Sequence, residues 1–213
     1  MEKTLYIPEI LEARLESDQQ ARSEVVREWG VQGTLTPQKW EPYYSNCQDV
    51  SVQFSLGYAN TTLYAYFKVN EPEIRAAHKK HNEAICEDSC TELFIQGTDG
   101  RYCNFEANPN CALLACTGEA RQNRTSLSES FFYELQIFTT KHGTKEWEIL
   151  MSLPFDQTGL IDPNSSLTGQ TLRGNLYKCG DKLQKPHYLA WSDVLTEKPD
   201  FHRPEFFGKF VFV

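Results

Sequence analysis

The chain has 213 residues, a length that predicts one or at most two domains with a substantial hydrophobic core. Its 21 basic and 29 acidic residues give a formal net charge of −8, and no segment is rich in Lys or Arg, which argues against nucleic acid and acidic membrane surfaces as partners. Hydrophobic residues make up 40%, and no apolar run approaches ~18 residues, which excludes wholesale disorder and membrane insertion.

Two segments of the chain predict helices. Residues 17–29 begin with Ser17 as a candidate N-cap, Gln20 stands three residues later as in a capping box, and Gly30 follows the last residue. Residues 73–81 are long enough for about two helical turns. We therefore expect one or two short helices.

The rest of the chain is typical of short strands separated by turns. Residues 50–56 alternate hydrophobic and polar side chains, and residues 63–69 follow after a turn at 57–60, which predicts an antiparallel hairpin. The other candidate strands are residues 92–96, 102–108, 112–116, 131–139, 146–153, 171–178, 188–191 and 209–213. Together with 13 Phe, 10 Tyr and 4 Trp, this pattern predicts an all-β fold of about ten strands.

Strands and helices do not alternate along the chain, which favours an antiparallel β-sandwich of the immunoglobulin or jelly-roll type over a doubly wound sheet. No internal repeat, low-complexity linker or shift in composition divides the sequence. We therefore predict a single domain over residues 1–213, with residues 1–45 as an N-terminal segment.

Seven cysteines form no CxxC pair, and five of them lie between Cys86 and Cys116. This spacing is unlike a zinc ribbon or a regular disulfide framework, so we expect reduced thiols that are mostly buried as small hydrophobic side chains. The chain begins MEKTLYIPEI, without the hydrophobic segment of a secretory signal. As written it predicts a cytoplasmic protein, and an exported protein whose leader had been removed would begin in the same way.

Acidic residues gather at Glu87, Asp88 and Glu92, with Glu106 on the next predicted strand. Paired carboxylates serve glycoside hydrolases when they are ~5 Å apart, but they also bind calcium or accept hydrogen bonds from sugar hydroxyls. A solvated loop would carry the same residues. Because the chain has no motif of a catalytic nucleophile, a glycoside hydrolase is the least favoured of these readings.

Several segments in a fixed order carry the motifs of a known family. They are LYAYFKVNEP at 63–72, EDSCTELFI at 87–95, EWEILMSLPF at 146–155, RGNLY at 173–177, HYLAWS at 187–192 and FHRPEFFGKF at 201–210. In this order, across about residues 50–213, the chain resembles carbohydrate-binding module family 9. It looks like the stand-alone, family 9-like branch found in gut-type polysaccharide-degrading bacteria.

The resemblance implies a β-sandwich that binds an oligosaccharide or polysaccharide without cleaving it. Members of the family hold the reducing end of a glycan between two Trp rings, and they bind calcium in a structural role. The implied ligands are plant-type glycans such as xylan and cellulose. Ring faces pack on the apolar face of a sugar, while polar side chains replace the water that its hydroxyls lose.

The residues at the family's ligand-binding positions are partly changed. Glu92 matches the acidic strand of the family, whereas Cys86 and Phe201 stand where the two Trp rings are implied. Glu106 replaces an Arg, and Tyr177 replaces a Gln.

We therefore expect a carbohydrate site in which Phe201, with Trp191 or Tyr177, provides the stacking rings. The expected polar partners are Glu92, Glu106, Asn175 and His202. The alternative is a structural or protein-interaction β-sandwich that has lost sugar binding, which the replacements at Cys86 and Glu106 favour.

Overall fold

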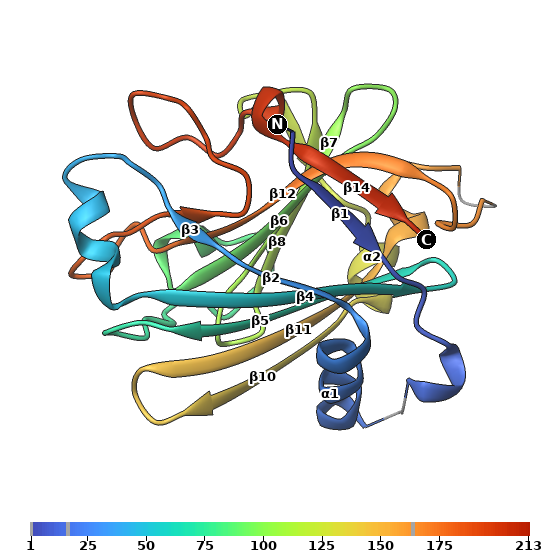
Figure 1. The fold of residues 1–213 in the computed structure, drawn as a ribbon, viewed down its shortest axis with the longest axis horizontal. Coiled ribbons are helices and arrows are strands. Elements are labelled where there is room, and N and C mark those ends of the chain that lie inside the picture. Colours follow the sequence, from blue (N-terminus) through green and yellow to red (C-terminus); the bar gives the residue numbers. More distant parts are fainter. Residues whose placement is uncertain (1, 16–17, 163–164) are drawn as a thin grey trace.

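Two β-sheets pack face to face and enclose the main hydrophobic core (Figure 1). The computed structural model describes residues 2–15, 18–162 and 165–213. The expected β-sandwich is confirmed. No helix among these residues is both long and apolar enough to span a membrane.

The smaller sheet, called sheet B here, is antiparallel throughout. Its strands, in spatial order, are β10 (Gln136–His142), β11 (Glu146–Pro154), β5 (Thr62–Asn70), β4 (Ser51–Ala59) and β2 (Val31–Thr34). The predicted hairpin is confirmed as β4 and β5, with Phe54 opposite Phe67. Its turn lies later than expected, because β4 continues to Ala59 and the chain reverses at Asn60, whose φ is 52°.

The larger sheet, called sheet A, carries the candidate site described below. Its strands, in spatial order, are β1 (Thr4–Ile7), β14 (Gly208–Phe212), β12 (Thr171–Cys179), β6 (Cys90–Gln96), β7 (Tyr102–Ala107), β8 (Leu113–Gly118) and β9 (Arg124–Ser126), with β13 (Leu189–Ala190) and β3 (Thr36–Pro37) joined to the end of β12. Among the strands of the described residues, β1 and β14 alone pair in parallel, so strands from the two ends of the chain lie side by side (Figure 1).

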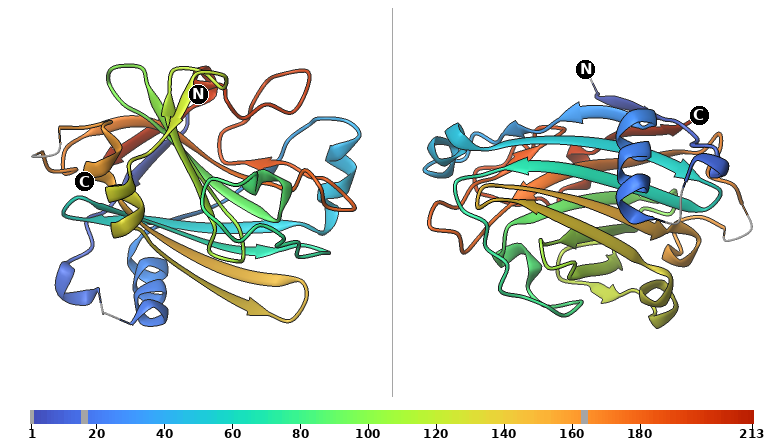
Figure 2. Two further views of the ribbon diagram at one scale, coloured as in Figure 1. Left: turned by 180° about the vertical axis from the view of Figure 1, so that it is seen from behind. Right: turned by 90° about the horizontal axis from the view of Figure 1, so that it is seen from below.

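Helices and short turns complete the structure. The α-helices are α1 (Gln19–Trp29) and α2 (Glu129–Glu134), and the 3₁₀ turns are η1 (Glu12–Arg14), η2 (Tyr43–Asp49), η3 (Ile85–Glu87), η4 (Phe155–Thr158) and η5 (Pro204–Phe206). Figure 2 shows α1 lying across the outer face of sheet B, where Val26 packs with Tyr64 and Tyr66. The predicted first helix is thus present. Its N-cap is Asp18, and the proposed cap Ser17 lies outside the described residues.

The second predicted helix, residues 73–81, is wrong. This segment forms no helix because a buried side chain takes its backbone hydrogen bonds: the carboxylate of Asp88 accepts the N–H groups of Ala77 and His78 at 2.9–3.0 Å. Residues 131–139 also differ from the predicted strand. They begin in α2, because the side chain of Ser128 caps that helix by accepting the N–H of Phe131.

Alternation along the strands of sheet A decides which side chains face the sandwich and which face outward. On β6, Leu93 and Ile95 enter the core between the sheets. Cys90 and Phe94 belong instead to a second hydrophobic cluster on the outer face of the same sheet. Loops cover this outer face, and the candidate site lies between them and the strands.

Candidate functional site

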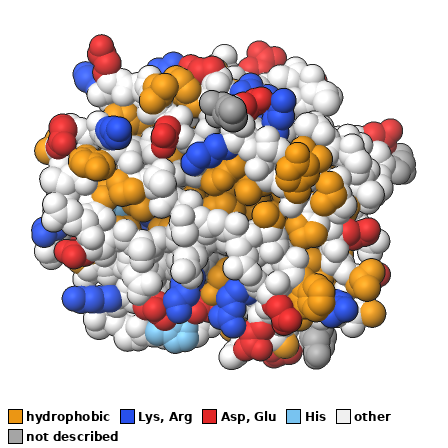
Figure 3. Space-filling model, viewed as in Figure 1, with side chains coloured by type: hydrophobic (Ala, Val, Ile, Leu, Met, Phe, Trp, Pro, Cys, Tyr) orange, Lys and Arg blue, Asp and Glu red, His pale blue; other side chains and the backbone are white. Residues whose placement is uncertain are grey.

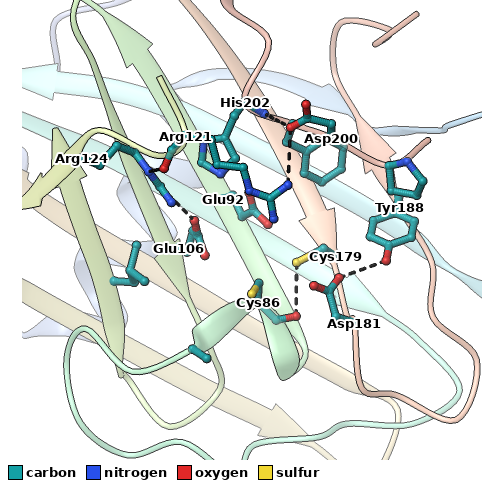
Figure 4. A pocket seen from close by; sticks show the side chains of 14 residues that line it. Cys86, Glu92, Glu106, Arg121, Arg124, Cys179, Asp181, Tyr188, Asp200 and His202 are labelled. Atoms are coloured by element: carbon teal, nitrogen blue, oxygen red, sulfur yellow. Dashed lines mark hydrogen bonds and ion pairs between the residues drawn. The ribbon is translucent and has the colours of Figure 1, made fainter. Parts of the chain in front are cut away.

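A pocket of about 260 Å³ opens on the outer face of sheet A (Figure 4). Its floor comes from three neighbouring strands, with Glu92 on β6, Glu106 on β7 and Cys179 on β12. Its walls come from loops and from the start of β9, with Arg124 toward one end and Asp181 toward the other (Figure 4). Between them, Nη1 of Arg121 reaches to 3.8 Å from Oδ1 of Asp200. The pocket therefore has a floor of strands and a border that carries both basic and acidic side chains.

Two carboxylates share the floor of this pocket. Glu92 and Glu106 lie directly opposite each other on antiparallel strands, and they are only 3% and 5% exposed. Burial raises the pKa of both groups, and the negative charge of Glu106 raises that of Glu92 further. Burial therefore favours the protonated form of the pair more than water would, and a protonated pair can both donate and accept hydrogen bonds.

Glu106 also has polar neighbours that orient it. The amide Nδ2 of Asn104 donates to Oε1 of Glu106 at 2.8 Å, and Nη1 of Arg124 lies 4.0 Å from the same oxygen. Nη1 of Arg124 is buried and has no hydrogen-bond partner. A ligand with hydroxyl or other acceptor oxygens would satisfy this donor.

Phe201 forms an aromatic wall of the pocket. Its ring stacks on Tyr177 with centroids 4.0 Å apart and 12° between the planes, and the hydroxyl of Tyr177 donates to the carbonyl of Phe201 at 3.3 Å. Trp40 and Tyr188 pack against the same ring at 5.6 and 6.0 Å. Phe201 is 8% exposed, so the ring is held firmly and only a small part of it reaches the pocket.

His202 is a neutral polar group in the pocket wall. Its Nδ1 lies 2.9 Å from the hydroxyl of Tyr102, and its backbone N–H donates to Asp200 at 3.1 Å. Burial and the positive charges of Arg124 and Arg121 lower the pKa of His202 to about 3. The imidazole is therefore uncharged at physiological pH and offers hydrogen bonds without a charge.

Thiols and an acidic group lie at the opposite end of the pocket. The thiol of Cys179 donates to the carbonyl of Cys86 at 3.6 Å, and the hydroxyl of Tyr188 donates to Oδ1 of Asp181 at 3.0 Å. Burial raises the pKa of both thiols and of Asp181. All seven cysteines of the chain are free, and four of them are buried.

Comparison with known families identifies the fold on which this pocket is built. The sequence pattern of carbohydrate-binding family 9 matches residues 29–212. The chain belongs to carbohydrate-binding family 9. This family is a non-catalytic one, and its members act by binding.

Solved structures share the fold of this chain. A provisionally assigned carbohydrate-binding protein from Bacteroides uniformis has 29% identity and a TM-score of 0.88, with 100% of each chain covered. A family 9 module from Caldicellulosiruptor kristjanssonii, solved with cellotriose, has 11% identity and a TM-score of 0.61 over 99% of this chain and 93% of that one. A family 9 module from the same organism, solved with glucose, has 11% identity and a TM-score of 0.60 over 99% of this chain and 96% of that one. No curated protein matches the chain.

Four of the residues expected from the sequence meet at the pocket. Glu92, Glu106, Phe201 and His202 all line it, and Cys86, at the position of an implied Trp, lines it too. These residues come from distant parts of the chain. The structure thus places four of the positions implied by the family resemblance, Cys86, Glu92, Glu106 and Phe201, around one cavity.

Three other expected residues lie outside the cavity. Tyr177 has no exposed surface and lies beneath Phe201, so it supports that ring and offers no face to a ligand. Trp191 packs in the core between the sheets, where it contacts Phe210 at 5.5 Å. Tyr177 and Trp191 are therefore not placed as stacking rings in this structure.

Asn175 is the third expected residue that lies away from the pocket. Its Nδ2 donates to the carbonyl of Ser192 at 2.8 Å, and its Oδ1 accepts the N–H of the same residue at 2.8 Å. It is completely buried. Asn175 therefore fixes the chain after β13 and makes no contribution to the cavity lining.

The acidic residues that lie close together in the sequence, Glu87, Asp88 and Glu92, have different surroundings in the structure. Asp88 is buried, and its Oδ2 accepts the side-chain amide of Asn108 at 2.8 Å in addition to its backbone bonds. Glu87 forms an ion pair with Lys182 at 2.8 Å. Only Glu92 and Glu106 face each other across the pocket floor.

Sequence reasoning missed several residues of the pocket wall, which are Arg121, Arg124, Asp181, Tyr188 and Asp200. All except Arg124 lie in loops. The three-residue spacing of the two arginines was visible in the sequence, but in a loop such spacing predicts no common direction. Only the folded loops place these charges over the strands.

Calcium, which the family resemblance implies, takes six to eight oxygen ligands. Two clusters of at least three metal-binding side chains occur among the described residues: Cys90 with Glu92 and Cys179, and His142 with Glu146 and Glu148. Each cluster includes a sulfur or nitrogen ligand. Neither therefore has the donor set that calcium prefers.

Proposed function

We propose that this family 9 protein binds a saccharide in the pocket formed by β6, β7 and β12, and does not cleave it. The observation that carries the proposal is the buried carboxylate pair of Glu92 and Glu106, set in a cavity with the aromatic edge of Phe201. A pair that shares a proton can donate to one sugar hydroxyl and accept from another. Membership of a carbohydrate-binding family supports the same ligand class.

The ligand that we propose is the end of a plant-type glycan of the xylan or cellulose kind. A volume of about 260 Å³ is at the small end of ligand pockets, which suits one or two sugar rings better than a long internal segment. The two structures of a family 9 module from Caldicellulosiruptor kristjanssonii, solved with cellotriose and with glucose, support a sugar of the cellulose kind.

The arrangement also differs from a site with two parallel stacking rings. Phe201 lends only part of one ring, so polar contacts with Glu92, Glu106 and Arg124 have to supply much of the affinity. We therefore expect weaker binding than two Trp rings provide, and a stronger dependence on the substitution of single hydroxyls.

The test is a thermal-shift and calorimetric screen against xylo- and cello-oligosaccharides with intact and with chemically reduced ends. A ligand at 100 times its Kd should stabilise the protein by about 2.7 kcal/mol, which raises its Tm by several degrees. We expect a shift with intact chain ends and a smaller one with reduced ends. Equal shifts with both would refute recognition of the reducing end.

Two variants connect the binding to the pocket. Glu106→Gln and Phe201→Leu should each lower the affinity at least about tenfold, which corresponds to about 1.4 kcal/mol. Glu12→Gln is the matched control, because Glu12 is an exposed carboxylate outside this pocket. An affinity that is unchanged in both pocket variants would place the sugar site elsewhere.

A structural or protein-binding role without sugar is the second candidate. It is favoured by Cys86 and Glu106, which lie in the pocket where the family resemblance implies a Trp and an Arg. Among the described residues visible in Figure 3, however, hydrophobic side chains form separate groups between charged and polar ones. A protein partner therefore finds no broad apolar surface on that face. No thermal shift with any glycan, together with a stable partner in a pull-down, would favour this second role.

A further inference from the structure

Two thiols and one carboxylate form a cluster at the floor of the pocket, where Glu92 and Cys179 line the cavity. Potential ligand atoms of Cys90, Glu92 and Cys179 all lie within 4.8 Å of one another, and all three residues are buried. The proposed contact between sugar and carboxylates does not explain these thiols.

The strands themselves bring the three groups together. Cys90 and Glu92 are two residues apart on β6, so their side chains leave the same face of sheet A. Cys179 is the direct cross-strand partner of Cys90 on β12. Two ligands therefore come from one strand and the third from its neighbour, with no flexible loop involved.

The separation of these atoms fits a tetrahedral ion. Zinc binds thiolates at about 2.3 Å, which places two sulfur ligands about 3.8 Å apart, and the ligand atoms of the cluster all lie within 4.8 Å of one another. Cysteine sulfur is a soft ligand that selects zinc and similar metals over calcium or magnesium.

The basic side chains around the cluster face other acidic groups, and Nη1 of Arg121 lies 3.8 Å from Oδ1 of Asp200. The ammonium group of Lys178, on the same strand as Cys179, turns to the other face of the sheet and pairs with Glu71 at 2.9 Å. The guanidinium of Arg124 lies 4.0 Å from Glu106, on the far side of the pocket floor. A bound divalent cation would balance the carboxylates of Glu92 and Glu106, which burial otherwise disfavours.

We propose that Cys90, Glu92 and Cys179 form a binding site for zinc or a similar thiophilic divalent cation. Glu92 and Cys179 line the pocket, so the ion enters through it. Binding releases the protons of the two thiols, and the two thiolates with the carboxylate then supply three of four tetrahedral positions. The fourth position faces the pocket and is open to water or to a ligand oxygen.

The second cluster in the described residues does not carry the same inference. In the group of His142, Glu146 and Glu148, the ammonium of Lys68 lies 3.1 Å from Glu146 and 3.5 Å from Glu148. A lysine therefore already supplies the positive charge there, and the group lies in a surface hairpin.

The test uses the full chain, kept reduced, and titrates it with Co²⁺ as a spectroscopic substitute for zinc. We expect one ion per chain, with the near-ultraviolet absorption of a thiolate-to-cobalt charge transfer, and zinc should displace it. Cys90→Ser and Cys179→Ser should remove this absorption, and Glu92→Gln should weaken cobalt binding about tenfold or more. Cys103→Ser is the matched control, because Cys103 is equally buried but faces the core on β7.

Two results would overturn the proposal. One is the absence of charge-transfer absorption in the reduced wild-type protein, and the other is absorption that persists in both Cys90→Ser and Cys179→Ser. If the cysteine variants fail to fold, X-ray absorption of the zinc-loaded wild type decides, since two sulfur ligands at about 2.3 Å are required. None of these readouts needs a sugar, so they stand apart from the glycan screen.

Discussion

Replacement of Lys178 by methionine should strongly destabilise the protein. Lys178 lies on β12 between Tyr177 and Cys179, but its side chain points into the sandwich, where its Nζ contacts Oε2 of Glu71 at 2.9 Å. Glu71 follows β5 of the other sheet, and its Oε1 accepts the indole N–H of Trp147 at 2.6 Å. This buried ion pair therefore connects the two sheets directly behind the pocket floor.

The pKa of Glu71 gives the magnitude. Burial alone would raise this pKa, but the charge of Lys178 and hydrogen bonds from His187, Lys178 and Trp147 lower it from 4.5 to about 2. One unit of pKa corresponds to about 1.36 kcal/mol, so these contacts favour the ionised carboxylate by about 3 kcal/mol. Removing one partner of a buried pair typically costs about 3–5 kcal/mol, and we expect Lys178→Met to fall in that range.

The pH dependence has a definite sign. Because the folded protein lowers the pKa of Glu71, this contribution is fully present above about pH 4.5 and is lost as the pH falls toward 2. The difference in unfolding free energy between wild type and Lys178→Met should therefore be largest near neutral pH and should shrink below pH 4.5. Urea unfolding followed by Trp fluorescence at pH 7 and at pH 3 measures it.

Lys68→Met is the control for this experiment. Lys68 is part-exposed and pairs with Glu146 at 3.1 Å, so its loss should cost at most about 1 kcal/mol. A Lys178→Met protein that is no less stable than Lys68→Met would refute the argument. The double variant with Glu71→Gln should recover part of the stability, because no buried charge then remains unpaired.

Three further predictions concern stability around the site. The folded protein raises the pKa of Glu92, so its contribution to stability is present at low pH and is lost as the pH rises. The Tm of Glu92→Gln should therefore fall less than that of wild type between pH 5 and pH 8. An equal fall of Tm in both proteins would contradict this. Asp88→Asn should lower the free energy of unfolding in urea by about 1.5–3 kcal/mol, because it weakens the charge-assisted hydrogen bonds from Ala77 and His78. Wild-type stability in this variant would disprove that role of Asp88. Gly174→Ala should lower the free energy of unfolding by about 1–3 kcal/mol, measured by calorimetry, or prevent folding, since a Cβ there would lie 2.3 Å from the ring of Phe210. An unchanged Tm would show that this ring moves freely.

Local sequence patterns determined most of the strands. Residues 50–56 and 63–69 alternate in polarity or carry aromatic and β-branched side chains, and these preferences act within a few residues of chain. The motifs from 63–72 to 201–210 also identified the family, because they preserve turns and core positions in order.

Long-range contacts decided what local patterns could not. The segment 73–81 has a helical composition, but Asp88 and Asn108 bind its backbone and hold it in a non-helical conformation. The short strand β1 depends on β14 from the other end of the chain, so its four residues carry little signal of their own. Tertiary hydrogen bonds outweigh propensities that are worth less than about 1 kcal/mol per residue.

The site shows the same division. The sequence by itself determined that Glu92, Glu106, Phe201 and His202 were candidates, because motif order assigns residues to strands and to the loops that follow them. Only the tertiary structure decided that these four meet in a pocket while Tyr177, Trp191 and Asn175 are buried beside it. The physical reason is that the direction of a side chain depends on strand register and on the packing of loops, and a one-residue change in register would reverse it.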